Sequence, residues 1–214
     1  GVMISILNMN IDSHFAIFEI GTNNFFEIKE LTKLVKPSQI FISNILSTHL
    51  ENFKTKKNIA LEKSDIFHKK FNSLAKTLYY QKNSKEEFII GDLAKQQKLK
   101  NIISIGKNKV DCYIKNIKYV EPYYQLNLRV LKKNLKITIN QYEEHKVINL
   151  IFILTFFILN KISTDIIIKN MNQIPLIDGR GSVHNILLNG FNIQLIDDSY
   201  NANPETMLQS IKNF

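Results

Sequence analysis

The chain has 214 residues, of which 44% are hydrophobic, and it carries a formal net charge of +9 and a single cysteine. This length and composition suffice for a sizeable buried core in a globular protein, while one cysteine excludes an intramolecular disulfide framework and fits a reducing cytosol. The lysines are scattered and form no compact arginine-rich element, so the charge indicates weak affinity for polyanions and no specific nucleic-acid reader.

The first half of the chain alternates between strand-like and helix-like patterns. Residues 14–20 and 39–45 predict apolar strands, and residues 25–35 between them carry apolar positions at helical spacing. A longer helical segment, residues 57–80, precedes a third predicted strand at residues 86–91. Because this βαβ order is typical of parallel sheets, we predict an α/β fold with a mostly parallel sheet and flanking helices.

The pattern changes in the second half of the chain. Residues 109–140 form short alternating runs that predict a small antiparallel β element attached to the parallel sheet. Helices are predicted at residues 141–160 and 163–171. The most apolar stretch, residues 147–159, is shorter than the roughly 20 residues that span a bilayer, so we predict a buried helix and no membrane span. The N-terminus shows no cleavable signal.

A second domain is predicted after the central one. Two strand-like runs and a helix that opens at Asn203 or Pro204 amount to about one strand and helix unit of a Rossmann-like domain. We therefore divide the chain into a central domain, residues 1–175, and a hinge with the start of a second domain, residues 176–214. So short a second part does not close a core, and we expect a chain that is truncated at its C-terminal end.

The segment LIDDSYNANPETM joins an apolar strand to a polar turn, which is where α/β proteins bind ligands. It resembles the first strand and turn of the C-terminal domain in Mur ligases of the MurF type, which add D-alanyl-D-alanine to UDP-N-acetylmuramoyl-tripeptide. The resemblance implies that Asp198 hydrogen-bonds the ATP ribose. It also implies that four residues shape the turn between nucleotide and acceptor substrate: Ser199, Tyr200, Asn201 and Asn203. Without the resemblance, this segment is a capped turn in which Asn203 is the N-cap of a helix.

Two earlier segments resemble the same family and imply a Mg²⁺ site. FAIFEIGTNNFFEI resembles a hydrophobic run followed by ELGAN and GEI, and ISNILSTHLENF resembles TNxxxxHLExF. The resemblance implies that Glu19 and His49 hold Mg²⁺, a role that a strand-end carboxylate and a neutral imidazole suit. Taken alone, Glu19 is a strand-end acid and His49 a surface or capping residue. The same segments contribute two predicted substrate-binding residues: Asn23 and Asn44.

A third segment, NIALEKSDIF, resembles the family pattern IAxxKxEIF. The family's lysine is carbamylated by carbon dioxide and becomes an anion that helps to position Mg²⁺; Lys63 occupies its place, and Asp65 replaces the glutamate that follows. A lysine reacts with carbon dioxide only after it loses a proton, and burial favours that loss because it lowers the pKa of the amine. On its own, Lys63 is an ordinary helix lysine.

The segments that resemble ATP contacts are less faithful to the family. EEHKVINLIFIL keeps His145 and Asn149 of the pattern GxHNxxN, and both are predicted to bind ATP. Glu143 replaces a glycine and Lys146 an asparagine, which adds bulk and charge where the nucleotide needs close approach. EFIIGDLA weakly resembles the family's NADD strand end, with Ile90 at the position of its asparagine.

One segment resembles a phosphate contact of the family, whereas the family's phosphate-binding loop has no counterpart in this chain. DGRGSVHNI resembles the family's interdomain GRG, which implies that the guanidinium of Arg180 contacts a phosphate or ribose. The phosphate-binding loop GxxGKT is absent. Gly106 and Lys107 are a chance match, because Asn101 and Asn108 stand where the loop needs glycine and Ser or Thr. The opening GVMISILNM resembles the stretch after that loop, so we expect the chain to begin inside the central domain.

These resemblances identify the chain as a Mur ligase of the MurF type. They imply a cytoplasmic ligase of peptidoglycan precursor synthesis that uses ATP and Mg²⁺, takes UDP-N-acetylmuramoyl-tripeptide and D-alanyl-D-alanine, and is monomeric if complete. The predicted catalytic residues are Lys63, His49, Glu19 and Arg180. We expect the isolated chain to be inactive. Two alternatives stay open: a noncatalytic remnant or interaction module, which the truncation and the substitutions favour, and a basic RNA-binding protein, which the charge alone favours.

Overall fold

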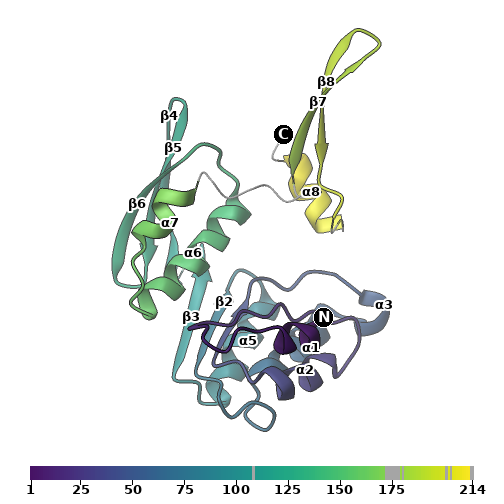
Figure 1. Cartoon of the computed structure of the whole chain (residues 1–214), viewed down its shortest axis with the longest axis vertical. Helices are drawn as coiled ribbons and strands as arrows, with labels where there is room; N and C mark the ends of the chain where they lie inside the picture. The colour runs from purple at the N-terminus through teal and green to yellow at the C-terminus, as the bar shows by residue number, and fades with distance from the viewer. Residues whose placement is uncertain (108, 172–178, 180, 201, 203, 213–214) are drawn as a thin grey trace.

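The computed structural model describes residues 1–107, 109–171, 179, 181–200, 202 and 204–212 (Figure 1). Two β-sheets carry its strands, one with the order β1-β2-β3-β4-β5-β6 and one made of β7 and β8. The elements follow along the chain as α1 (Val2–Leu7), α2 (Glu27–Val35), β1 (Gln39–Ile42), α3 (Leu50–Phe53), α4 (Lys56–Ser64), the 3₁₀ turn η1 (Asp65–Phe67), β2 (Thr77–Gln81), α5 (Lys85–Gln96), β3 (Asn101–Gly106), β4 (Cys112–Val120), β5 (Tyr123–Val130), β6 (Lys133–Ile139), α6 (Glu144–Leu159), α7 (Asp165–Asn170), β7 (Ser182–Leu188), β8 (Phe191–Asp197) and α8 (Pro204–Lys212).

The larger sheet joins a parallel part to an antiparallel part. β1, β2, β3 and β4 pair in parallel, whereas β4, β5 and β6 pair antiparallel. β4 belongs to both parts, because Cys112 and Tyr113 at its start pair with β3 while most of the strand pairs with β5. This arrangement confirms the predicted α/β fold with a mostly parallel sheet and an attached antiparallel element.

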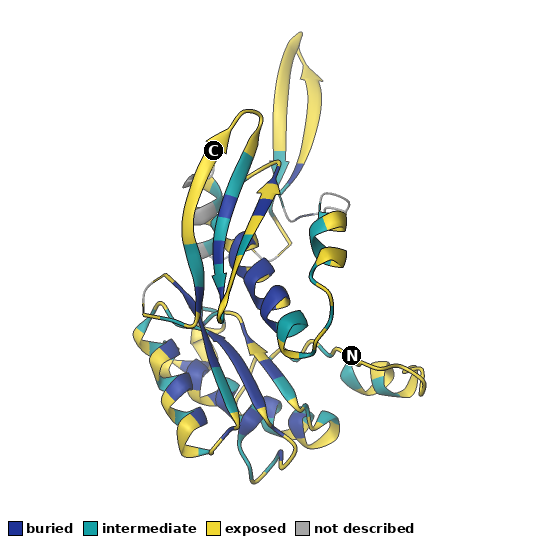
Figure 2. Cartoon of the chain, turned by 90° about the vertical axis from the view of Figure 1, so that its left-hand side faces the viewer, coloured by how far each residue is buried: buried dark blue, intermediate teal, exposed yellow. Residues whose placement is uncertain are grey.

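The C-terminal part also contains the predicted elements. β7 and β8 form an antiparallel hairpin, and α8 begins at Pro204 as expected. In Figure 2 most of this hairpin is coloured as exposed. The predicted boundary between residues 175 and 176 lies outside the described residues.

Three predicted elements in the first half are wrong, and two of them lie between residues 57 and 91. Residues 57–80 do not form one helix, because α4 and η1 are followed by the central strand β2. Residues 86–91 lie in α5 and not in a strand. A capping box starts that helix: the Ser84 hydroxyl accepts the Glu87 N–H at 3.4 Å, and the Glu87 carboxylate accepts the Ser84 N–H at 2.8 Å. The comparison of Ile90 with a strand-end asparagine is therefore also wrong, since Ile90 is buried on a helix.

The strand predicted at residues 14–20 is likewise not formed. This segment has no regular secondary structure, and its backbone joins no ladder in the described part of the chain. Ile17 is 91% exposed, although Phe15 packs edge-on against Phe156 of α6 with ring centroids 5.4 Å apart. Apolar alternation predicts an extended segment, but a strand also requires a neighbour to accept its hydrogen bonds.

The capping box gives a testable contribution to stability. Replacing Ser84 with alanine removes the side-chain acceptor at the N-terminus of α5, and we expect the free energy of unfolding to fall by about 1 kcal/mol. Denaturant unfolding measures this change. Ser73→Ala, at an exposed turn serine, is the control and should change the unfolding free energy by less than about 0.5 kcal/mol. Equal effects of the two substitutions would contradict the assigned cap.

The core consists of two apolar clusters on opposite faces of the sheet. Tyr79 and Ile103 belong to one cluster with α6, whereas Leu78 and Tyr80, the neighbours of Tyr79 along β2, belong to the other with α4 and α5. Successive side chains of a strand point to opposite faces, so α6 covers one face and α4 and α5 cover the other. Figure 2 shows the dark blue of both clusters in the central strands and in the helix beside them.

The apolar helix α6 is part of this core, as predicted. Val147, Ile151 and Leu154 are among its buried residues. In the described part of the chain, no helix combines the length and apolar character that crossing a membrane requires.

Cys112 is a packing residue, as expected. It is fully buried, and burial raises the pKa of its thiol. Because the thiolate is the reactive form, we expect alkylation by iodoacetamide at mildly basic pH to be more than about 100-fold slower in the folded chain than in denaturant. Mass spectrometry measures the two rates, and rapid labelling of the folded chain would contradict this burial.

Candidate functional site

Polar residues gather where the parallel strands end. β1, β2 and β3 run in the same direction, so their carboxyl ends meet at one edge of the sheet, and α/β proteins bind ligands at this edge. Asn44 follows β1, Asn83 follows β2 and Lys107 follows β3. The Asn83 side chain accepts the Lys107 N–H at 3.3 Å and passes so close to Gly106 that a Cβ there would lie 2.5 Å from Asn83 Oδ1. Gly106 is needed for this close approach.

Lys63 reaches this edge from α4. Its Nζ donates to the backbone carbonyl of Asn44 at 3.0 Å, so the structure brings together two residues that the sequence predicted for the site. Burial lowers the pKa of the Lys63 ammonium, and the nearby Glu87 carboxylate opposes that shift. The neutral amine is thus more accessible here than at an exposed lysine, which is the condition for reaction with carbon dioxide.

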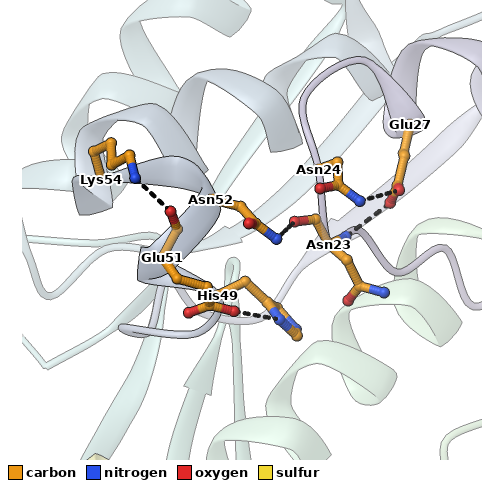
Figure 3. Close-up of polar contacts among 7 residues, drawn as sticks. All are labelled: Asn23, Asn24, Glu27, His49, Glu51, Asn52 and Lys54. Carbon is orange, nitrogen blue, oxygen red and sulfur yellow. Dashed lines mark hydrogen bonds and ion pairs between the residues drawn. The ribbon is translucent and has the colours of Figure 1, made fainter.

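The loops that carry Asn23 and His49 are tied to each other (Figure 3). Asn52 of α3 donates from its side-chain amide to the carbonyl oxygen of Asn23 at 2.8 Å. His49 is the N-cap of α3 in a left-handed conformation, with φ of 53°, and its Nδ1 lies 3.7 Å from a carboxylate oxygen of Glu51. The structure therefore places His49 and Asn23 on neighbouring segments that are far apart in sequence.

The Asn23 loop is held from its own helix as well. Glu27 accepts the Asn23 N–H at 2.8 Å and the side-chain amide of Asn24 at 2.9 Å, and these hydrogen bonds lower the pKa of the Glu27 carboxyl. Glu62 of α4 accepts further backbone N–H groups of this loop. Sequence reasoning missed both Asn52 and Glu62, because a side chain whose partners lie about 30 residues away gives no local signal.

The three predicted Mg²⁺ ligands do not form a metal-binding cluster in the described part of the chain. Glu19 is exposed and makes no hydrogen bond with another described residue. Among the described residues, no group of three or more His, Cys, Asp and Glu side chains is placed to hold a metal ion. Carbamylation of Lys63 would add two oxygen donors of the kind that Mg²⁺ prefers. The assignment of Glu19, His49 and Lys63 to a metal stays a prediction.

The N-terminus of α6 carries the predicted ATP contacts. His145 and Asn149 are both exposed on this helix. Glu143, which replaces the family's glycine, lies 3.5 Å from His145 Nε2 and 2.5 Å from Lys146 Nζ. The two substituted residues therefore pair with each other, and their charges offset. Beside them a cavity of about 270 Å³ is lined by Gly106, Lys107, Ile114, Lys115, Tyr142 and Glu144.

The turn after β8 is held by its first aspartate. Asp197 accepts the N–H and the hydroxyl of Ser199, which lowers the pKa of its carboxyl. Asp198, the predicted ribose contact, instead accepts the hydroxyl of Ser210 in α8. Tyr200 is exposed and its N–H donates to Gly179 at 3.0 Å. Three further predicted site residues lie outside the described residues: Arg180, Asn201 and Asn203.

Comparison with known proteins places these features in a family. The sequence profile of the Mur ligase middle domain matches residues 1–156. Among curated relatives, UDP-N-acetylmuramoyl-tripeptide--D-alanyl-D-alanine ligase of Rickettsia prowazekii is 30% identical over 99% of this chain and 46% of its own length. The ligase of the same name from Buchnera aphidicola subsp. Baizongia pistaciae is 29% identical over 99% of this chain and 45% of its own.

Solved structures show the same fold. MurF from Acinetobacter baumannii aligns with a TM-score of 0.83 and 23% identity over 99% of this chain and 45% of that one. MurF ligase from Thermotoga maritima in complex with ADP aligns with a TM-score of 0.78 and 22% identity over 100% of this chain and 47% of that one. The chain thus spans a little under half the length of the relatives it matches.

Proposed function

The chain belongs to the Mur ligase family, and from that membership we propose that it is part of an ATP-dependent amide ligase of peptidoglycan synthesis. In the proposed reaction, the γ-phosphoryl group of ATP is transferred to the terminal carboxylate of UDP-N-acetylmuramoyl-tripeptide. The amine of D-alanyl-D-alanine then attacks the acyl phosphate, forms the amide and releases phosphate. The names of the curated relatives support these substrates, and the fold agrees with a MurF type.

The observation that carries this proposal is the position of Lys63. A lysine amine that is partly buried, has a lowered pKa and lies 3.0 Å from the Asn44 carbonyl at the ligand-binding edge is suited to carbamylation. We propose that the carbamate, with Glu19 and His49, holds Mg²⁺. When bound, this ion offsets the negative charge that develops during phosphoryl transfer. The residues of the chain thus contribute positioning and electrostatic stabilisation rather than nucleophilic attack.

The remaining roles are also proposals. Asn23 and Asn44 bind the tripeptide substrate; Asn44 follows β1 at the edge of the sheet, and the side chain of Asn52 holds the loop of Asn23. The ATP contacts that we propose are His145, Asn149, Arg180 and Asp198. The residues proposed to shape the turn next to the acceptor dipeptide are Ser199, Tyr200, Asn201 and Asn203. We further propose that the complete protein is a cytoplasmic monomer, as the family resemblance implies.

One observation favours the alternative of a noncatalytic remnant. Glu143 introduces a carboxylate at the N-terminus of α6, where the family resemblance predicts a nucleotide, and like charges repel the phosphates. Its ion pair with Lys146 reduces that repulsion. ATP affinity therefore distinguishes the ligase from the remnant.

An assay of the complete protein that contains this chain tests the proposed function. We expect formation of the pentapeptide product and ADP that requires ATP, Mg²⁺ and D-alanyl-D-alanine together. L-alanyl-L-alanine is the matched control substrate and should give no product. Failure to form product with the correct dipeptide, at saturating ATP and Mg²⁺, would refute the ligase and leave the remnant.

A further inference from the structure

Glu62 is a buried carboxylate whose described partners are all on one distant turn. Its side chain is on α4 and only 4% of the residue is exposed. Oε2 accepts the Phe26 N–H at 2.8 Å and Oε1 accepts the Ile28 N–H at 2.9 Å, while the Thr22 hydroxyl lies 3.5 Å from Oε1. No ion pair joins Glu62 to a cation in the described part of the chain. A buried carboxylate without a cation is stable only if hydrogen bonds replace its hydration, and these N–H groups do so.

The turn that Glu62 binds is strained and has no cap of its own. Phe26, the N-cap of α2, has φ of 74°, a left-handed conformation that non-glycine residues seldom adopt, and its side chain is 65% exposed. The N-caps of α4 and α5, Thr55 and Ser84, supply their own side-chain acceptors. α2 begins without one, so the carboxylate of another helix satisfies its first N–H groups and favours the positive φ of Phe26.

Glu62 connects two parts of the candidate site, the turn that carries Asn23 and the helix that carries Lys63. Glu62 holds the turn of residues 22–28, and the next residue along the chain, Lys63, holds Asn44 on the loop after β1. From the other side, Asn52 holds the carbonyl of Asn23 at 2.8 Å. The turn that carries Asn23 is therefore fixed by Glu27 of its own helix and by two side chains from other helices, Asn52 and Glu62.

We propose that Glu62 is a positioning residue that fixes the turn of residues 22–28, and with it Asn23, relative to Lys63; its effect on substrate binding rests on the proposed ligase function. Both carboxylate oxygens are used as acceptors. Glutamine has nearly the same shape but only one acceptor oxygen, so its NH₂ group must face either the Phe26 or the Ile28 N–H. Glu62→Gln therefore breaks one hydrogen bond without leaving a cavity.

Amide hydrogen exchange in the 214-residue chain tests whether Glu62 fixes the turn of residues 22–28. In Glu62→Gln we expect exchange at Phe26 or Ile28 to be about 10- to 100-fold faster than in the wild type. Exchange at Ile103 in β3 reports global stability and serves as the reference. Glu30→Gln removes the same charge from an exposed position on α2 and should leave both amides unchanged. Equal acceleration at Ile103 and at the turn, or none at the turn, would overturn the proposal.

The ligase assay of the complete protein tests the functional part. Because a displaced Asn23 weakens substrate binding, we expect Glu62→Gln to raise the KM for UDP-N-acetylmuramoyl-tripeptide about 5-fold or more with little change in kcat. A purely structural loss lowers the active fraction, and so kcat, at unchanged KM; that result would overturn the positioning role. If the wild-type complete protein has no ligase activity, the proposed function fails, while the exchange experiment still decides whether Glu62 holds the turn.

Discussion

Replacing Lys63 with arginine in the complete protein is expected to lower kcat by about 100-fold or more, with the fold intact. Arginine keeps the positive charge and the length of the side chain, so it can still donate to the Asn44 carbonyl that Lys63 contacts. Its guanidinium is always protonated and cannot form the carbamate that lysine forms. The substitution therefore removes the proposed anion without removing the contact, and steady-state rates of ADP release measure the effect.

The lowered pKa of Lys63 gives the direction of the pH dependence. A lower pKa means that a larger fraction of the amine is neutral at a given pH, so carbamylation should begin at lower pH than at an exposed lysine. We expect a carbamate carbon signal in NMR spectra with ¹³C-bicarbonate that is present in the wild type, grows as pH rises and is absent in Lys63→Arg.

A lysine on the same helix provides the matched control. Lys57 is exposed on α4, so Lys57→Arg should leave both the carbamate signal and kcat unchanged. Full activity of Lys63→Arg, or an unaltered signal in that variant, would contradict the proposed modification.

The sequence predicted best those elements whose pattern and partners are close together. Residues 109–140 alternate over consecutive hairpins, and β4, β5 and β6 formed as expected because each strand pairs with the next one along the chain. β2 was missed although its TLYYQ run is rich in residues that favour strands, because the helical pattern before it was extended too far. At residues 86–91 a strand was predicted because the spacing of Ser84 and Glu87, which is typical of a capping box and indicates a helix, was overlooked.

In the candidate site, too, the contacts between residues far apart in sequence were the ones that were missed. The family resemblance implied site roles for both Lys63 and Asn44, and the structure joins them through a hydrogen bond. Glu62 is the neighbour of Lys63 in sequence, yet its partners Phe26 and Ile28 precede it by more than 30 residues. A buried acid that binds backbone N–H groups looks like a surface acid in sequence, because the donors are present in every residue.

The second large effect is a loss of stability, and two isoleucines of the same helix, α6, are expected to differ in it. Ile151 of α6 is fully buried between the helix and the sheet, whereas Ile153, two positions later, is 44% exposed. We expect Ile151→Ala to lower the free energy of unfolding by about 2–5 kcal/mol, because it removes apolar contacts and leaves a cavity in a packed core. Ile153→Ala removes the same atoms from a site in partial contact with water and should lower it by less than about 1 kcal/mol.

The comparison of these two variants tests which face of α6 packs against the sheet. At about 2–4 °C per kcal/mol for a chain of this size, Ile151→Ala should lower Tm by at least about 4 °C, and Ile153→Ala by no more than about 4 °C; calorimetry measures both. A helix this apolar could in principle bury any of its faces, so its sequence alone does not distinguish the two isoleucines. The sheet makes the distinction: α6 packs on the face that carries Tyr79 and Ile103, and Ile151 belongs to that cluster. Equal losses from both substitutions would mean that α6 does not pack on the sheet through this face, and the orientation of His145 and Asn149 at its N-terminus would then have to be reassigned.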